Sequence, residues 1–110
     1  MRVAIGSDEA GYGLKCQLAE HLRDVGVDVE DVGCFSTDPA LYPDVAEKVC
    51  AKIKSGEADR GVLVCGTGIG MAITANKIPG IRAAVGHDSY SVERMVLSNN
   101  AQVITFGARI

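Results

Sequence analysis

Two spacings of apolar residues alternate along this chain and predict alternating strands and helices. Short apolar runs rich in β-branched residues have the length and composition of buried strands. Five such runs occur, at residues 3–5, 27–32, 62–64, 83–85 and 103–106. The chain is therefore expected to form five strands.

The segments between these runs have the period of amphipathic helices, with apolar residues three or four positions apart. The stripes are Leu14, Leu18 and Leu22, then Val45, Val49 and Ile53, then Val92, Met95 and Val96. A further helix is expected from near Ile69 to the Asn-Lys-Ile-Pro-Gly sequence at 76–80, and Asp88 or Ser89 would cap the last one. Strands that alternate with helices favour an α/β fold, a parallel sheet with helices on both faces and right-handed crossovers.

The carboxyl ends of two strands are the expected place for a ligand. Ligands of such sheets bind beyond those ends, where the strand order reverses. We expect the flavodoxin-like order 2-1-3-4-5, which places this point between the first and third strands. The first strand ends at Ser7-Asp8-Glu9 and the third at Cys65. A carboxylate pair and a thiol are thus predicted to face one another.

Residues 61–71, with the sequence GVLVCGTGIGM, carry the most informative pattern. A buried strand delivers Cys65 to a loop with glycines at 66, 68 and 70. A helix that begins near Ile69 would direct its N-terminus and the loop amides at the thiol, which favours an anion and a thiolate there. The alternative is a small buried cysteine that closes a strand. Nucleotide-binding patterns do not fit, because Met71 replaces the third glycine of the dinucleotide fingerprint and Gly-Lys-Ser/Thr is absent.

The composition and charge of the chain argue against several classes of protein. The chain has 110 residues, 47% of them hydrophobic, and a formal net charge of −3 without a basic cluster, which argues against nucleic-acid or anionic-membrane binding. No segment has the length of a membrane span or the pattern of a signal peptide, so a cytoplasmic location is expected. The four cysteines include no Cys-x-x-Cys pair and no side chains have metal-ligand spacing, so we predict neither disulfides nor a metal.

Four segments resemble one enzyme family over the whole chain. They are DEAGYGLK at 8–15, YPDVAEKV at 42–49, SGEADRGVLVCGTGIGMAITANKIPGIRAA at 55–84 and SNNAQVITFGARI at 98–110. They are similar to the ribose-5-phosphate isomerase B and galactose-6-phosphate isomerase family. The long middle segment is too specific for a chance likeness between glycine loops.

The resemblance implies aldose–ketose isomerisation of a phosphorylated sugar through an enediolate, without a cofactor. It also implies a Rossmann-like sheet, and homodimers or higher oligomers whose sites draw residues from both subunits. By similarity, Cys65 is the base that moves a proton between C1 and C2, a role that suits a stabilised thiolate. The amides around Gly66, Thr67, Gly68 and Gly70 are suited to stabilise the enediolate oxygen by a few kcal/mol, so Thr67 joins Cys65 as a catalytic residue.

Other site residues follow from the same resemblance. Asp8 matches an aspartate that contacts sugar hydroxyls, Tyr42 a tyrosine that lines the site, and Asn99 an asparagine beside the catalytic centre. For Asp8 alone, a helix N-cap is an equal alternative. Two positions depart from the family, which usually has histidine where this chain has Glu9 and Ser98.

These departures leave three explanations open. In the family, the histidine that corresponds to Ser98 is credited with opening the sugar ring. A serine hydroxyl does not take this role near neutral pH. The first is an active isomerase of a phosphorylated sugar, ribose 5-phosphate-like or shorter, and in particular of one that needs no ring opening, such as a four-carbon ketose phosphate. Cys65 would be its base and Glu9 a substituted acid–base group or hydroxyl ligand. Alternatively the chain is a non-catalytic partner subunit, or a small-molecule-binding domain.

The remaining candidates are weaker. His87 follows the fourth strand and either lines the crevice or belongs to a capping loop. Arg82 and Arg109 are candidate anion contacts, and His21 has no assigned role. We expect one isomerase domain over residues 1–110 that lacks the further helix and the tail rich in arginine and histidine which members of the resembling family usually have after the Gly-Ala-Arg motif. A partner is expected to cover apolar residues of the fifth strand.

Overall fold

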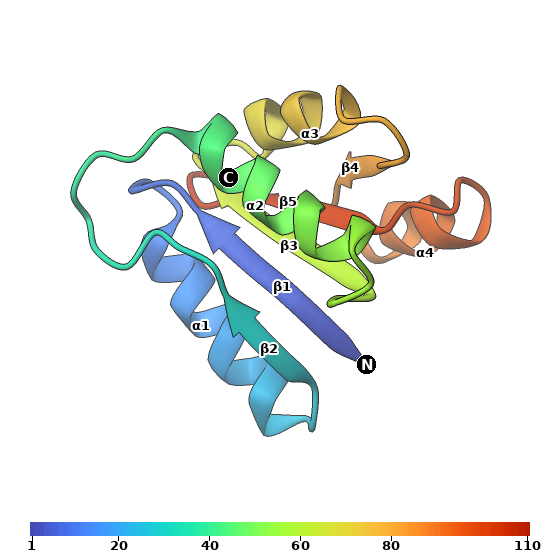
Figure 1. Cartoon of the computed structure of the whole chain (residues 1–110), viewed down its shortest axis with the longest axis horizontal. Coiled ribbons are helices and arrows are strands. Elements are labelled where there is room, and N and C mark those ends of the chain that lie inside the picture. Colours follow the sequence, from blue (N-terminus) through green and yellow to red (C-terminus); the bar gives the residue numbers. More distant parts are fainter.

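The fold is described from a computed structural model that covers residues 1–110 (Figure 1). Strands and helices alternate throughout, and the five strands and four helices predicted from the apolar pattern are confirmed. In chain order they are β1 (Arg2–Ser7), α1 (Tyr12–Asp24), β2 (Asp28–Asp31), α2 (Tyr42–Lys54), β3 (Arg60–Cys65), α3 (Ile69–Asn76), β4 (Ala83–Val85), α4 (Ser89–Leu97) and β5 (Val103–Gly107).

All five strands belong to one parallel sheet, in the order β2-β1-β3-β5-β4. The predicted order 2-1-3-4-5 is therefore wrong at one end of the sheet, because β5 lies between β3 and β4. The reason is the length and burial of the two strands. Five residues of β5 pair with β3 and bury alternate side chains, whereas β4 has only three half-buried residues, and a short strand leaves little unpaired edge.

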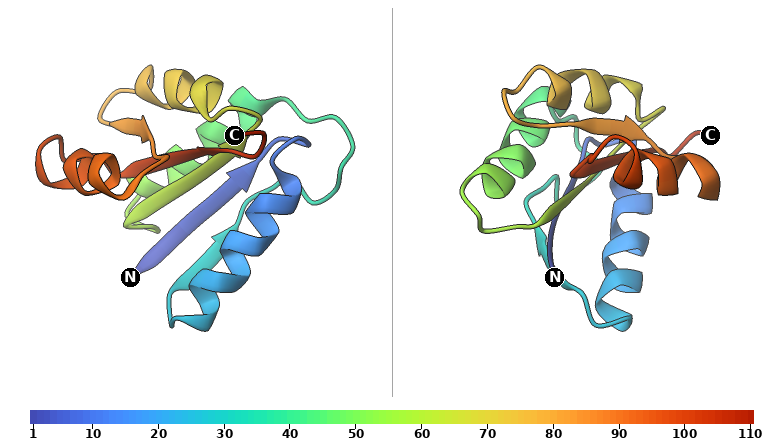
Figure 2. Two further views of the ribbon diagram at one scale, coloured as in Figure 1. Left: turned by 180° about the vertical axis from the view of Figure 1, so that it is seen from behind. Right: turned by 90° about the vertical axis from the view of Figure 1, so that its right-hand side faces the viewer.

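Two layers of helices enclose this sheet, as predicted. Helices α2 and α3 cover one face, and α1 and α4 lie on the other, which the right-hand view of Figure 2 shows with the sheet between them. The larger core packs α2 and α3 on the sheet, with Val49, Leu63 and Met71 fully buried. Burial of such side chains contributes about 1.5–3 kcal/mol each. No helix combines the length and hydropathy that a bilayer span requires.

The ends of the strands define two edges of the molecule. Because the strands are parallel, Ser7 at the end of β1 lies beside Val64 near the end of β3, and Cys65 pairs with Gly107 of β5. The carboxyl ends of the three central strands therefore meet at one edge of the molecule, the carboxyl edge. The start of each strand lies at the opposite edge, the amino edge.

Candidate active site at the carboxyl ends of the strands

Cys65 is the last residue of β3, and its side chain is directed at the loop that follows. The thiol belongs to the core beneath α2 and α3, and 6% of the residue is exposed. Its Sγ accepts a hydrogen bond from the Gly68 amide at 3.1 Å. The Gly68 amide at the start of α3 is therefore aimed at the sulfur. The predicted convergence of the thiol and the loop amides is thus present.

Gly68 gives this loop its shape. Its φ of +81° is a left-handed conformation that glycine adopts without strain, and the residue is the N-cap of α3. The Gly68 carbonyl accepts a hydrogen bond from Thr105 Oγ1 at 2.8 Å, and a Cβ at Gly68 would lie 3.1 Å from the Phe106 backbone. The loop is therefore held against β5. Thr67 Oγ1 accepts from the Ile69 amide at 3.2 Å at the start of the helix.

Asp8 lies directly beside the strand that carries the thiol. Its amide donates to the Val64 carbonyl at 3.2 Å, one residue before Cys65, and its carboxylate accepts from the Gly11 amide at 3.0 Å. Burial raises the pKa of Asp8 above its usual value, although the Gly11 hydrogen bond opposes this and the charge of Glu9 adds to it. The cap of α1 is Gly11, so Asp8 closes the turn before the helix rather than capping it.

Glu9 is bonded to the backbone of a distant segment of the chain. Its Oε2 accepts a hydrogen bond from the Ala40 amide at 3.0 Å, and this bond lowers the pKa of the carboxyl. Ala40 belongs to the connection between β2 and α2, so Glu9 fastens that connection to the turn after β1. An ionised carboxylate already bonded to a backbone amide is poorly suited to shuttle protons.

Tyr42 and Gly70 form one contact at this edge. Tyr42 begins α2, and its ring atoms Cε1 and Cζ lie 2.9 and 3.1 Å from the position that a Cβ at Gly70 would take. The glycine therefore allows the tyrosine ring to rest on the first turn of α3. The tyrosine is placed beside the loop that follows Cys65.

Arg109 lies in the same site, although only the Gly-Ala-Arg sequence after the fifth strand pointed to it. Its amide donates to the Gly66 carbonyl at 3.0 Å, and its Nη1 lies 3.3 Å from where a Cβ at Gly66 would be. Its charge lowers the pKa of both Asp8 and Glu9, as a minor contribution beside the burial of Asp8 and the Ala40 bond of Glu9. The site thus contains one guanidinium and two carboxyls.

Asn99 lies at the opposite edge of the sheet, and the structure does not bring it to Cys65. It follows α4 together with Ser98, just before a segment fixed to the starts of β3 and β4. There Ala101 accepts from Arg60 at 2.7 Å and Asn100 from Arg82 at 2.8 Å. The six residues of β3 separate the two edges by about 16 Å, at roughly 3.3 Å per residue. Arg82 is accordingly a structural side chain at the far edge.

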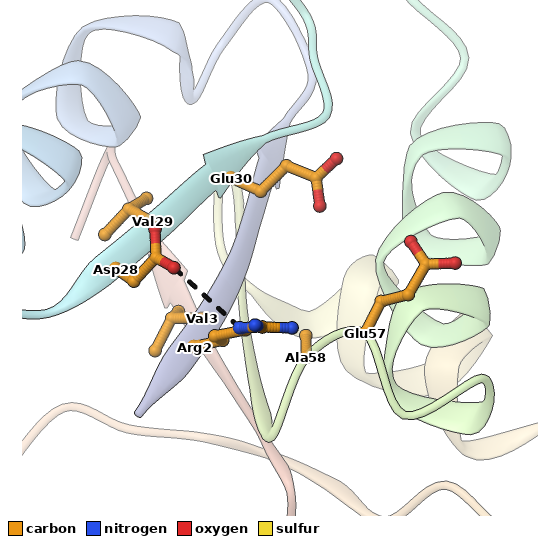
Figure 3. Close-up of a pocket in the computed structure, with 7 residues that line it drawn as sticks. All are labelled: Arg2, Val3, Asp28, Val29, Glu30, Glu57 and Ala58. Atoms are coloured by element: carbon orange, nitrogen blue, oxygen red, sulfur yellow. Dashed lines mark ion pairs between the residues drawn. The ribbon is translucent and has the colours of Figure 1, made fainter.

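Hollows in the surface do not mark this site. One of them, of about 410 Å³, lies at the opposite edge. Figure 3 shows Arg2 of β1 paired there with Asp28 of β2, at 3.8 Å, with Glu30 from the same strand and Glu57 from the segment after α2. Another hollow, of about 550 Å³, lies beside the carboxyl ends of β4 and β5. His87 forms part of its lining, which favours the interpretation that this residue lines the crevice over the capping-loop alternative. Cys65 lines none of them. No three His, Cys, Asp or Glu side chains form a metal-binding group.

Comparison with known proteins identifies the class. The Ribose/Galactose Isomerase family matches residues 3–110, and the chain belongs to this family, which confirms the resemblance. It is an enzyme of the isomerase class. The chain is 54% identical to "Ribose-5-P isomerase B" of Listeria innocua serovar 6a over 110 residues, which are 100% of this chain and 74% of that protein.

Two further relatives extend the comparison. "D-erythrulose-4-phosphate isomerase 2" of Mycolicibacterium smegmatis is 50% identical over 113 residues, 100% of this chain and 74% of that protein. The structure of Clostridium thermocellum ribose-5-phosphate isomerase B superposes with a TM-score of 0.98 at 44% identity, covering 100% of this chain and 74% of that one. The fold and the family are therefore shared over the whole chain.

Proposed function

We propose that this enzyme interconverts an aldose and a ketose phosphate through an enediolate, with Cys65 as the base. The hydrogen bond from the Gly68 amide to Cys65 Sγ, at 3.1 Å, carries the proposal. A buried cysteine that only fills the core needs no donor aimed at its sulfur. The cysteine here ends a strand where ligands of α/β sheets bind.

The reaction requires one proton to move between two carbons. The Cys65 thiolate takes the proton from C2 of the aldose, the C2–H electrons form the C1–C2 double bond, and O1 becomes the enediolate oxygen. The thiol returns a proton to C1, and O2 becomes the ketose carbonyl as its hydroxyl proton passes to O1. Amides of the Gly66–Gly70 loop are the donors for the developing negative charge, a role in which one donor contributes about 3 kcal/mol.

Two charged groups are proposed to orient the substrate. Asp8, held beside Val64, accepts hydrogen bonds from sugar hydroxyls. Arg109 provides the cation for the phosphate, since its guanidinium packs over Gly66 at the same edge. Glu9 keeps the connection before α2 in place and takes no part in proton transfer.

The proposed substrate is a four-carbon sugar phosphate that exists in open-chain form. With Ser98 in place of a histidine there is no imidazole at that position for ring opening, and a tetrose phosphate needs none. The name of the relative "D-erythrulose-4-phosphate isomerase 2" supports this choice. "Ribose-5-P isomerase B" makes a five-carbon sugar the competing substrate.

We also propose that the active form is a homodimer or higher oligomer, without a cofactor and in the cytoplasm. Asn99 lies at the wrong edge to reach the Cys65 of its own chain. A second copy that brings its α4 end to the carboxyl edge would complete the site. Residues 1–110 would then act as one isomerase domain that is functional only in the assembly.

The test is conversion of three phosphorylated sugars followed by ¹³C NMR. D-erythrulose 4-phosphate, ribose 5-phosphate and galactose 6-phosphate are compared for the wild type and Cys65→Ala. Turnover of the four-carbon sugar alone, abolished in Cys65→Ala, is the expected result. Turnover of ribose 5-phosphate at a similar rate would overturn the substrate assignment. No turnover by a folded protein would favour a partner subunit or a binding domain.

A further inference from the structure

Lys15 is the one charged side chain that is fully buried in this molecule. It is 1% exposed, and the other buried polar residues are the neutral Ser7 and Thr105. A lysine is almost never buried to this extent unless its charge has partners, because loss of hydration opposes burial. The residue lies in the second turn of α1, beside the turn that carries Asp8.

The ammonium has partners in several directions. Its Nζ lies 2.7 Å from Asp31 Oδ2 and donates to the Cys34 carbonyl. The rings of Tyr12 and Phe35 have their centroids 5.0 and 5.2 Å from the nitrogen, within the range of cation–π attraction. These contacts join α1 to the end of β2 and to the residues that follow it.

The segment held in this way also continues the sheet beside β1. The Ser7 amide donates to the Gly33 carbonyl at 2.7 Å, and the Cys34 amide donates to the Ser7 carbonyl at 2.9 Å. Asp31 assists, because its second oxygen accepts from the Gly33 amide at 2.9 Å. Ser7 directly precedes Asp8, so the position of Asp8 depends on this pairing.

The same segment leads to the other side of the site. The connection over residues 32–41 arches away from the sheet between β2 and α2 (Figure 1). Its far end is fastened by the bond from Ala40 to Glu9 and delivers Tyr42 to Gly70. Lys15 therefore fixes the near end of a connection whose far end lines the active site.

We infer that Lys15 is a positioning residue for the isomerase: it clamps residues 32–41 so that Asp8 and Tyr42 keep their places around Cys65. This inference rests on the proposed function for its catalytic readout. A neutral side chain would leave both the Asp31 carboxylate and the Cys34 carbonyl without their partner. A neutral side chain at residue 31 removes the unpaired carboxylate, but the Cys34 carbonyl still lacks the donor that Lys15 provides.

The test compares Lys15→Met with the double variant Lys15→Met/Asp31→Asn. The Asp31→Asn change keeps the side-chain oxygen that accepts from the Gly33 amide and removes the unpaired charge. We expect the double variant to regain most of the melting temperature lost in Lys15→Met, while kcat/KM stays about 100-fold below wild type, the effect of a displaced site. A double variant with near wild-type kcat/KM would overturn the inference, since Lys15 would then only neutralise Asp31.

A second readout does not depend on activity. Cys34 is partly buried with its Sγ 3.7 Å from Ser7 Oγ, whereas Cys50 is fully buried. Iodoacetamide labelling resolved by mass spectrometry should show Cys34 of the double variant reacting about tenfold faster or more, with Cys50 unchanged as the control for global unfolding. Unchanged labelling of Cys34 would refute the clamp. If the wild type converts no sugar of the panel, the proposed function fails, and the Cys34 rate still decides whether Lys15 holds the connection.

Discussion

The two edges of the sheet carry charged groups in different ways. At the amino ends of the strands the charges pair on the surface. Lys52 lies 2.8 Å from Glu57 and 3.0 Å from Glu30, and these two carboxylates border the hollow of about 410 Å³. In such exposed ion pairs the opposite charges offset one another, and salt screens the remaining field. Little charge is therefore free to act on a ligand.

The carboxyl edge has its hollow beside β4 and β5, away from Cys65, but has donors directed by the backbone. The Gly68 amide points at the thiol of the buried Cys65, and the amides of Gly11 and Ala40 hold two carboxylates. Fixed dipoles of this kind need no reorganisation when charge develops in a reaction. The comparison teaches that what distinguishes the two edges is backbone donors directed from strand ends and helix starts.

The largest effect should come from Gly68, compared with Gly80 as a matched control. Both have a positive φ, so alanine costs about 1–2 kcal/mol of stability at either position. Only at Gly68 would the new Cβ meet neighbours, at 3.1 Å, and it would displace the amide bonded to Cys65. We expect kcat to fall about 100-fold in Gly68→Ala and to stay near wild type in Gly80→Ala. Equal kcat values in the two variants would show that the Gly66–Gly70 loop takes no part in catalysis.

A smaller effect is expected from Asn99, which lies at the amino edge of its own chain. If the active site is completed by a second copy, Asn99→Ala lowers kcat by about tenfold or more without changing stability. Mixing this variant with Cys65→Ala should raise the activity above the sum of the two separate variants, because some sites then combine an intact Cys65 with an intact Asn99. Activity assays of the mixed and separate proteins make the comparison. No recovery from stable mixed dimers would contradict a shared site.

One carboxyl from each edge, Asp8 and Glu57, should respond oppositely to pH. Burial raises the folded-state pKa of Asp8, so its ionisation opposes folding above that pKa, and the penalty disappears below the unfolded value of about 3.9. The bond from Lys52 lowers the pKa of Glu57, so its stabilisation is present above about 4.3 and is lost as the pH falls through the folded value. At neutral pH, Asp8→Asn should raise the melting temperature and Glu57→Gln should lower it. Both differences should vanish in acid, and calorimetry over the pH range would reject the assignment if both variants shifted in one direction.

The sequence allowed much of this site to be predicted, for a simple geometric reason. Residues that directly follow parallel strands gather at one edge, which placed Asp8 and Cys65 together before the fold was known. The same rule points to Arg109 after β5. It also puts Asn99, which comes just before β5, at the opposite edge, so that signal was present in the sequence.

Other features could not be deduced from the apolar pattern. The runs that form β4 and β5 are both short and apolar, and only pairing across the sheet decides which one lies at the edge. The bond from Ala40 to Glu9 arises in a connection without periodicity, and the burial of Lys15 depends on partners sixteen or more residues away at Asp31 and Cys34. Tertiary contacts of this kind have no local signature.

Deuterium exchange tests the central claim, that Cys65 is the base, most directly. Proton NMR in deuterated water would follow C1 and C2 of the sugar that the wild type converts, for the wild type, Cys65→Ala and Cys50→Ala. Burial raises the pKa of Cys50 to about 11, so its thiol is inert and serves as the matched control. We predict that wild type and Cys50→Ala incorporate deuterium at the same rate and that Cys65→Ala is slower by about 100-fold or more. Exchange by Cys65→Ala at the wild-type rate would contradict the assignment.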